Sequence, residues 1–345
     1  MSRINRQWLL ARRPNGPAVL EDFEFREQGV EQPELKEGEV QLHNMAFLCA
    51  PTMRNWMDPP GNSLYPSIPI GDPVMAPSAG RVTASAHPDY PVGSRIATIS
   101  SWQDYEVLLP DERPTQVIPE GQTFLDALGI FGLNALAGYF GLLEVGQPEP
   151  GETVVVSGAA GSAGSVAAQI AKIKGCRVIG IAGGPDKCGW LVDHCGLDAC
   201  IDYKRESVAD RLKELCPDGI NIFFDNVGGE VLQAVIENMA EFGRIVLCGQ
   251  IASYNDGEAP EGPRNMMRLI YGGMRMQGFL MGHYADKFAE AVKELEAWEK
   301  QGLIKHREDI REGFDSLPRV FNALFEGKNK GTLIVQIDEK ATETQ

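Results

Sequence analysis

Hydrophobic positions follow two different patterns along the chain. Residues 1–125 contain short apolar runs bounded by glycine and proline, which is typical of short β-strands joined by turns. The clearest of these runs are 38–42, 80–83 and 94–99. Residues 57–77 contain six prolines and predict a loop on the surface. The sequence therefore predicts a β-rich first part.

After Gln122 the pattern changes, and short apolar runs alternate with segments of helical spacing. This alternation predicts βαβ units and a parallel, doubly wound sheet, so the predicted fold class is α/β. The expected strands are 153–156, 177–182, 199–202, 220–224 and 243–248, and the expected helices are 125–143, 162–174, 186–195, 206–215 and 229–240.

The last part of the chain combines a helix and a strand. Residues 332–337 predict a strand that can pair back with the β-rich first part. The predicted domains are thus 1–125, an α/β domain over 126–300, and a segment over 301–345 that returns to the first domain. Apolar side chains recur every three or four residues over 284–302, which predicts an amphipathic helix ending at Gly302: Phe288, Val292, Leu295 and Trp298.

Composition and charge narrow the function classes. The 345-residue chain is 43% hydrophobic and 23% charged, as in ordinary globular proteins. Its 32 Lys and Arg against 48 Asp and Glu give a net charge of −16, which opposes binding to nucleic acid, and no basic run offsets it. The longest weakly charged stretch, 125–143, is interrupted by Asp126 and Asn134 and is too short for a membrane span. The N-terminus lacks the apolar segment of a secretion signal, so we expect a cytoplasmic protein.

Cysteine and histidine positions argue against a disulfide framework and against zinc. The seven cysteines are an odd number without a CxxC pair, which predicts free thiols in a reducing compartment. A zinc alcohol dehydrogenase needs Cys, His and usually Glu from the β-rich domain. Cys49 lies at a plausible place, but residues 70–73 read Ile-Gly-Asp-Pro, with Asp72 in place of the histidine. The five histidines show no ligand-like spacing, so we expect no metal.

The strongest local signal is the stretch Val-Val-Val-Ser-Gly-Ala-Ala-Gly-Ser-Ala-Gly-Ser at 154–165. A buried strand runs into Gly-x-x-Gly-x-x-Gly, and a helix-forming segment follows at once. Glycine lets the backbone approach a pyrophosphate closely, while the helix N-terminus offers unpaired N–H groups and partial positive charge. The context between a strand and a helix favours dinucleotide binding. A tight turn with nothing bound is the alternative.

The segment after the second strand bears on the choice between NAD and NADP. An NAD site usually ends that strand with Asp or Glu, which bonds the ribose 2′-hydroxyl. Here 180–184 reads Gly-Ile-Ala-Gly-Gly, without a carboxylate, and Lys187 follows. Small residues and a cation suit a 2′-phosphate, and residues 203–205, Tyr-Lys-Arg, are placed to complete the pocket. Lys187 alone also fits a solvated helix start, but together these residues favour NADP, so NADPH is the predicted cofactor.

Four stretches resemble one enzyme family: 139–143, 161–165, 225–229 (Asp-Asn-Val-Gly-Gly) and 248–255 (Cys-Gly-Gln-Ile-Ala-Ser-Tyr-Asn). On these motifs the chain resembles the zinc-independent medium-chain dehydrogenases/reductases. Within them it is similar to the prostaglandin reductase (leukotriene B4 12-hydroxydehydrogenase) and curcumin reductase group of NADPH-dependent enone reductases. The resemblance covers essentially the whole chain. It implies a GroES-like catalytic domain built from both termini, a central Rossmann domain and a homodimer.

The resemblance also implies roles for individual residues. The turn residues Gly161, Ser162, Ala163 and Gly164 are expected to hold the pyrophosphate. Lys187 and Tyr203 are expected to hold the adenosine 2′-phosphate. The remaining residues expected to line the cofactor are Asn226, Cys248, Gly249, Ile251, Ser253, Tyr254, Phe279, Leu280, Met281 and Asn329.

The implied reaction is reduction of the C=C bond of an α,β-unsaturated ketone or aldehyde, a small-molecule enone or enal. Hydride from NADPH adds to the β-carbon, and negative charge develops on the carbonyl oxygen. The neutral phenol of Tyr254 can hydrogen-bond that oxygen, and Tyr65 on the proline-rich loop is a second candidate. For both tyrosines the alternative is packing, Tyr254 against the cofactor and Tyr65 within its loop.

Two stretches depart from the family pattern. Family members typically have Asp-Pro-Tyr-Met-Arg where 50–54 reads Ala-Pro-Thr-Met-Arg. They also have Met-Pro-Gly-Leu-Thr-Ala-Tyr where 133–139 reads Leu-Asn-Ala-Leu-Ala-Gly-Tyr. Thr52 and Asn134 are therefore candidate substrate-pocket residues, and the particular enone stays open. A quinone reductase, an allylic-alcohol dehydrogenase and a non-catalytic NADPH-binding protein are the alternative functions.

Overall fold

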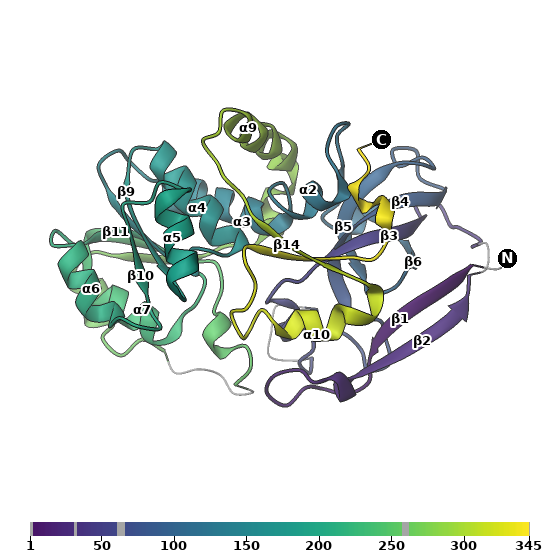
Figure 1. Cartoon of the computed structure of the whole chain (residues 1–345), viewed down its shortest axis with the longest axis horizontal. Helices are drawn as coiled ribbons and strands as arrows, with labels where there is room; N and C mark the ends of the chain where they lie inside the picture. The colour runs from purple at the N-terminus through teal and green to yellow at the C-terminus, as the bar shows by residue number, and fades with distance from the viewer. Residues whose placement is uncertain (1–2, 31–32, 61–65, 257–261, 345) are drawn as a thin grey trace. The chain divides into compact units, whose positions relative to one another are not determined.

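The computed structural model describes residues 3–30, 33–60, 66–256 and 262–344, and the chain divides into two compact units (Figure 1). The first unit consists of Met1–Gly132 and Glu308–Gln345, and we call it the β-rich unit. The second unit is Leu133–Arg307, and we call it the Rossmann unit.

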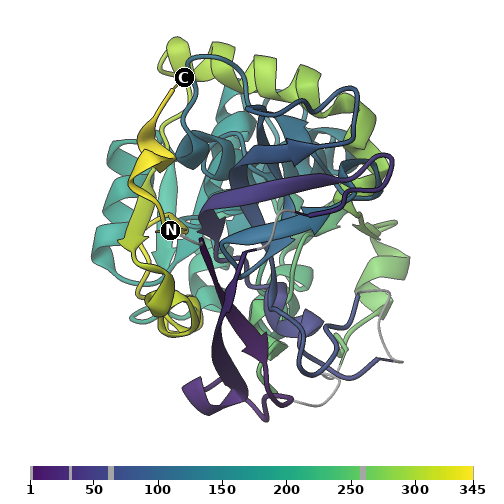
Figure 2. The ribbon, with the colours of Figure 1, turned by 90° about the vertical axis from the view of Figure 1, so that its right-hand side faces the viewer.

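A seven-stranded sheet is the centre of the β-rich unit (Figures 1 and 2). Its strand order is β14-β15-β3-β4-β5-β7, and β6 pairs with β3. The C-terminal β15 pairs antiparallel with β3, with Ile334 opposite Leu48, so the strand pairing predicted for 332–337 is confirmed. The strands are β3 Val40–Leu48, β4 Met75–Ser85, β5 Arg95–Ser101, β6 Tyr105–Leu108, β7 Gln116–Val117, β14 Glu308–Glu312 and β15 Thr332–Gln336.

Among the described residues of this unit there are two further strands and three short α-helices. β1 Ile4–Leu10 and β2 Phe23–Gly29 form a separate antiparallel pair, purple in Figure 2. The helices are α1 Met53–Trp56, α2 Phe124–Leu128 and α10 Leu317–Asn322. Large apolar side chains from these elements form one buried cluster that includes Trp8, Phe47, Trp102, Phe314 and Phe321.

The Rossmann unit is built on a six-stranded sheet in which every neighbouring pair is parallel. Its order, β10-β9-β8-β11-β12-β13, is that of a doubly wound dinucleotide-binding fold, in which ligands bind at the carboxyl ends of the strands. The predicted α/β fold class is confirmed. The strands are β8 Thr153–Ser157, β9 Arg177–Ala182, β10 Ala199–Asp202, β11 Ile220–Asp225, β12 Met239–Leu247 and β13 Arg275–Gly278.

Helices cover this sheet because their apolar faces pack on the strands. One face carries a cluster in which Leu212, Val235 and Ile236 pack against Val155 and Ile179 of the sheet. The apolar positions predicted for the helix near the end of the unit are all buried in α9. The helices are α3 Leu133–Phe140, α4 Ser162–Ile173, α5 Pro185–Asp193, α6 Val208–Leu215, α7 Gly229–Ile236, α8 Met267–Tyr271 and α9 Phe288–Lys300.

Two predicted helices have the wrong extent. The segment 125–143 forms two helices, α2 and α3, because the backbone leaves the helical region at Gly129 and a Cβ at Gly132 would lie 2.5 Å from the Leu128 carbonyl oxygen. The helix predicted over 229–240 ends at Ile236, because Met239 pairs with β11 as the first residue of β12. The break in the first segment is local, at its glycines, whereas the second helix ends because strand pairing overrides its helical pattern.

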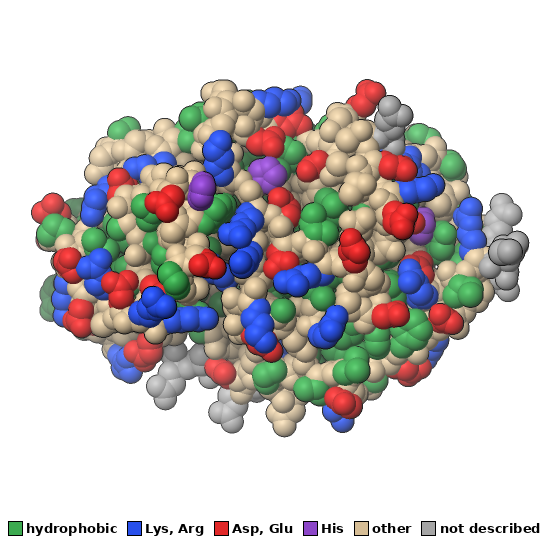
Figure 3. All heavy atoms as spheres, in the orientation of Figure 1, with side chains coloured by type: hydrophobic (Ala, Val, Ile, Leu, Met, Phe, Trp, Pro, Cys, Tyr) green, Lys and Arg blue, Asp and Glu red, His purple; other side chains and the backbone are tan. Residues whose placement is uncertain are grey.

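Acidic and basic side chains are interspersed over the face drawn in Figure 3, over both units. Within the described ranges, no helix is both long enough and apolar enough to cross a lipid bilayer.

Candidate active site

The glycine-rich turn between β8 and α4 brings two stretches of backbone into close contact. Gly158 follows the strand with a φ of +58°, and the N–H of Gly161 donates to the Gly158 carbonyl at 2.9 Å. A Cβ on Gly164 would lie 2.4 Å from that carbonyl oxygen, so only a hydrogen fits there. The turn therefore presents bare backbone at the carboxyl end of the sheet, where a ligand can approach closely.

The N-terminus of α4 has the features of a phosphate site. Its N-cap is Gly161, which has no side chain to accept the first N–H groups of the helix. Among the described residues, the hydroxyl oxygen of Ser162 is buried and has no hydrogen-bond partner. Leaving such a hydroxyl unpaired costs free energy, and a phosphate oxygen at this turn would satisfy it. The residues present therefore fit a dinucleotide pyrophosphate.

A second glycine lets α3 pack closely against α4. A Cβ on Gly138 would lie 2.4 Å from the carbonyl oxygen of Ala163. Directly after α3, Gly141–Gly146 forms a π-helical turn, and the Phe279 ring lies 2.5 Å from the position of a Cβ on Gly141. Asn134, in the first turn of α3, is half-buried. Helix α3 thus supports the α4 end of the turn.

The expected 2′-phosphate residues lie at the carboxyl ends of β9 and β10. A Cβ on Gly183 would lie 2.9 Å from the ring of Tyr203, so that ring packs directly against the backbone after β9. Tyr203 is 51% exposed. Lys187 is half-buried in the first turn of α5. An aromatic ring and a cation therefore flank Gly183 and Gly184, and Asp186 follows in the first turn of α5.

Sequence reasoning missed Asp202, the last residue of β10. The residue is 7% exposed, and its Oδ1 accepts hydrogen bonds from the N–H of Gly184 at 2.8 Å and of Lys204 at 3.1 Å. Asp202 therefore fixes the turns that carry the two expected phosphate-binding side chains. The signal was available, because an acidic residue ends an otherwise apolar strand immediately before 203–205.

A second buried carboxylate organises the end of β11. Asp225 is 1% exposed, and its Oδ1 accepts from Ser157 Oγ at 2.8 Å and from the N–H of Val227 at 2.9 Å. Burial raises the pKa of Asp225, while the bonds from Gly228, Val227 and Ser157 lower it. Asn226 donates from Nδ2 to the Ser157 carbonyl at 2.7 Å. These bonds join the ends of β8 and β11 beside the glycine-rich turn.

The 248–254 loop is hydrogen-bonded to the turn that follows β11. The N–H groups of Cys248 and Gly249 both donate to the Asp225 carbonyl, at 2.9 and 3.0 Å. Tyr254 Oη accepts from the N–H of Gln250 at 3.0 Å, which orients the phenol. Burial raises the pKa of the Cys248 thiol to about 12, so it stays protonated at neutral pH. In the same loop, Ile251 and Ser253 form a short 3-10 turn.

Other predicted site residues lie apart from this cluster in the chain. Leu280 is 47% exposed and Met281 begins the 3-10 turn Met281–Lys287. Asn329 and Thr52 belong to the β-rich unit, where Asn329 Nδ2 donates to the Gly331 carbonyl at 2.8 Å and Thr52 precedes α1. Tyr65 lies outside the described residues.

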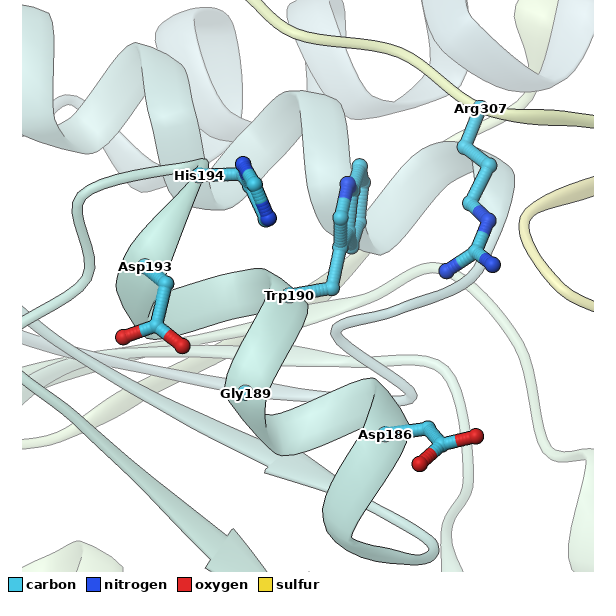
Figure 4. Close-up of a pocket in the computed structure, with 6 residues that line it drawn as sticks. All are labelled: Asp186, Gly189, Trp190, Asp193, His194 and Arg307. Atoms are coloured by element: carbon cyan, nitrogen blue, oxygen red, sulfur yellow. The ribbon is translucent and has the colours of Figure 1, made fainter.

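A shallow pocket of about 330 Å³ lies beside α5 (Figure 4). In the close-up the Trp190 side chain stands between those of His194 and Arg307. The lining includes none of the residues that the sequence assigns to the cofactor, and we assign it no role. The full lining is Asp186, Gly189, Trp190, Asp193, His194 and Arg307.

Cys49, the cysteine at the position considered for zinc, is buried in the apolar core of the β-rich unit. Burial raises the pKa of its thiol to about 12. Across the part of the chain that the structure describes, no three His, Cys, Asp or Glu side chains are grouped so as to hold a metal ion.

Comparison with known proteins places this architecture among dinucleotide-dependent oxidoreductases. Residues 6–117 match the family "N-terminal domain of oxidoreductase", and residues 163–297 match the family "Zinc-binding dehydrogenase". NADPH-dependent curcumin reductase of Escherichia coli is 37% identical over 339 residues, which cover 96% of this chain and 97% of the relative. Prostaglandin reductase 1 of Oryctolagus cuniculus is 37% identical, over 94% of this chain and 91% of the relative.

A solved structure gives the same result. CurA of Vibrio vulnificus, crystallised in complex with NADPH, has a TM-score of 0.89 and 36% identity, covering 97% of this chain and 99% of that chain. The fold and the turn define a medium-chain dehydrogenase/reductase. The chain belongs to this family of NADP-dependent oxidoreductases, in the branch that includes curcumin reductase and prostaglandin reductase 1. The resemblance seen in the sequence motifs is confirmed.

Proposed function

We propose that this protein uses NADPH to reduce the C=C bond of α,β-unsaturated ketones and aldehydes. The observation that carries the proposal is the turn at 158–164, where bare backbone, a helix N-terminus and the unpaired buried hydroxyl of Ser162 fit a pyrophosphate. The relatives named as reductases, and the NADPH complex of the similar structure, support both the cofactor and the direction of the reaction.

In this proposal the turn and its neighbours bind the cofactor. Gly161 to Gly164 hold the pyrophosphate, and Lys187 and Tyr203 bind the 2′-phosphate. Asn226, whose amide is tied to β8, and the 248–254 loop line the nicotinamide half, together with Phe279, Leu280 and Met281. Asn329 completes the set that the family resemblance implies.

The proposed reaction is a 1,4-reduction, in which hydride from NADPH adds to the β-carbon of the substrate and an enolate oxygen develops. Tyr254 hydrogen-bonds that oxygen. Its Oη accepts a hydrogen bond from the Gln250 N–H, which orients the phenol within the 248–254 loop. Hydrogen-bond donors placed at a developing enolate oxygen stabilise its negative charge. Solvent then protonates the α-carbon.

Three residues are candidates for the substrate pocket. Thr52 and Asn134 replace residues typical of the family, and we propose that they select among enones. Tyr65 stays a prediction, because it lies outside the described residues.

The homodimer that the resemblance implies has support from the Rossmann unit. Phe242, Ile270 and Tyr271 are 76%, 69% and 83% exposed, and Phe242 packs on Gly273 beside β13, the last strand of the described sheet. Apolar side chains this exposed are typical of a contact surface. A molar mass of one chain in solution would contradict the dimer.

The reaction is tested by incubating the purified protein with NADPH or NADH and a panel of 2-alkenals, enones, quinones and allylic alcohols. We expect oxidation of NADPH at 340 nm with enones and enals, and a saturated carbonyl product identified by mass spectrometry. Turnover of quinones alone, or of allylic alcohols with NADP⁺ alone, would replace the proposal with one of those activities. Binding of NADPH without any turnover would favour a non-catalytic role.

Replacing Lys187 tests the cofactor preference. Lys187→Ala is expected to raise the KM for NADPH about tenfold, since a charged contact to phosphate is worth roughly 1.5–3 kcal/mol, and to change the KM for NADH less than about twofold. Lys213→Ala, on the exposed face of α6, is the matched control and should change neither constant. Equal losses with both cofactors would contradict the assignment of the 2′-phosphate to Lys187.

Replacing Tyr254 tests the role of its hydroxyl. Tyr254→Phe is expected to lower kcat about ten- to hundredfold with little change in the KM of the enone, because the bond strengthens only as charge develops on oxygen. Tyr90→Phe, in a turn of the β-rich unit, serves as control. A kcat equal to that of the unaltered protein, with a deuterium isotope effect showing that hydride transfer limits the rate, would leave Tyr254 a packing residue.

A further inference from the structure

We propose that Cys188 and Cys200 are a thiol pair that closes into a reversible disulfide in the folded enzyme, joining α5 to β10. Their Sγ atoms lie 2.8 Å apart, and the Cys200 thiol donates toward the Cys188 sulfur. Both side chains are half-buried, so small oxidants and reductants reach them. The sequence analysis grouped all seven cysteines as unpaired thiols, because residues 188 and 200 form no recognisable motif.

The fold holds the two thiols against each other. Cys200 lies opposite Gly180 in the parallel pairing of β10 with β9, and α5 packs over these two strands. The Cys188 sulfur lies 4.0 Å from the carbonyl oxygen of Ala182, the last residue of β9. A disulfide is about 2.05 Å long, so closing the bond brings the sulfurs less than about 1 Å closer. The bond therefore forms without unfolding either element.

The oxidation balances with a peroxide as the named oxidant. The Cys188 sulfur attacks the O–O bond of hydrogen peroxide, which gives a sulfenic acid and one water. The Cys200 sulfur then attacks the Cys188 sulfur, the S–S bond forms, and the hydroxyl leaves with the Cys200 proton as a second water. Two thiols lose two electrons and two protons, and one peroxide becomes two waters. A dithiol reductant reverses the change.

The contact between the thiols makes Cys188 the attacking sulfur. Burial raises the pKa of both thiols, but the hydrogen bond from Cys200 lowers the pKa of Cys188. Asp202 and Glu206 act the other way on Cys188, through their negative charge. The pair therefore reacts more slowly than a thiol activated for catalysis.

The disulfide joins the two segments that carry Lys187 and Tyr203, the residues proposed to bind the adenosine 2′-phosphate. Cys188 follows Lys187 in α5, and β10 leads from Cys200 to Tyr203. Because the sulfurs move by less than about 1 Å, we expect the oxidised protein to keep its KM for NADPH within about twofold. This expectation rests on the proposed function. The disulfide also closes a loop in the unfolded chain and so lowers the conformational entropy of that state. The Tm of the oxidised protein is therefore expected to rise by a few degrees.

The experiment is peptide mapping of the full-length protein after treatment with hydrogen peroxide, alkylation of remaining thiols and digestion without reductant. Cleavage before aspartate separates the relevant cysteines into 186–192, 193–197 and 198–201, which carry Cys188, Cys195 and Cys200. We expect 186–192 linked to 198–201, two hydrogens lighter than the sum of the two free peptides, with recovery of both after dithiothreitol.

Cysteine variants distinguish a specific disulfide between Cys188 and Cys200 from unspecific oxidation of cysteines. Cys188→Ser and Cys200→Ser should each abolish the linked peptide and the rise in Tm. Cys176→Ser, whose native thiol donates to the Glu149 carbonyl at 3.3 Å, should keep both. Alkylated Cys188 and Cys200 after oxidation, or a link to Cys195, would overturn the proposal, as would a Tm that is unchanged in the linked protein. The mapping needs neither NADPH nor substrate, so it stands or fails independently of the proposed reaction.

Discussion

The close approach of α4 to the turn after β8 is the constraint on which the proposed site depends. Gly164 faces the Gly158 carbonyl at a distance that admits no side chain, and Gly138 does the same where α3 meets α4. These contacts bring the N-terminus of α4 to the carboxyl edge of the sheet, with the Ser162 hydroxyl buried beside it. The proposed pyrophosphate site is therefore built from backbone rather than from charged side chains, in a protein whose net charge is −16.

Two buried carboxylates position what surrounds that turn. The Asp225 carboxylate accepts hydrogen bonds from the Ser157 hydroxyl and the Val227 N–H. The backbone carbonyl of Asp225 accepts hydrogen bonds from the first two N–H groups of the 248–254 loop. Asp202 fixes the turn between β9 and α5 through Gly184. Neither residue is proposed to touch the reacting atoms: Asp202 holds the turn proposed for the 2′-phosphate, and Asp225 holds the loop that carries Tyr254. The chemistry thus depends on hydrogen bonds that keep flexible segments at the sheet edge in one arrangement.

Local sequence patterns predicted the structural features that depend on residues close together in the chain. The apolar run at 153–156, the glycine spacing at 158–164 and the lack of a carboxylate at the end of β9 predict the cofactor region, and relatives confirm the family. The features that local patterns did not predict are long-range: the early end of α7 and the contact between Cys188 and Cys200. Those features arise from strand pairing and packing between segments distant in the chain.

The most direct test of the central claim is the dissociation constant of NADPH for Gly164→Ala, measured by titration calorimetry beside Gly189→Ala. A Cβ at Gly189 meets nothing closer than Asp193 Oδ2 at 3.6 Å, so this variant controls for the substitution itself. The account predicts affinity at least about tenfold weaker for Gly164→Ala, equivalent to roughly 1.4 kcal/mol, and unchanged affinity for Gly189→Ala. A folded Gly164→Ala protein that binds NADPH as tightly as the unaltered chain would contradict it.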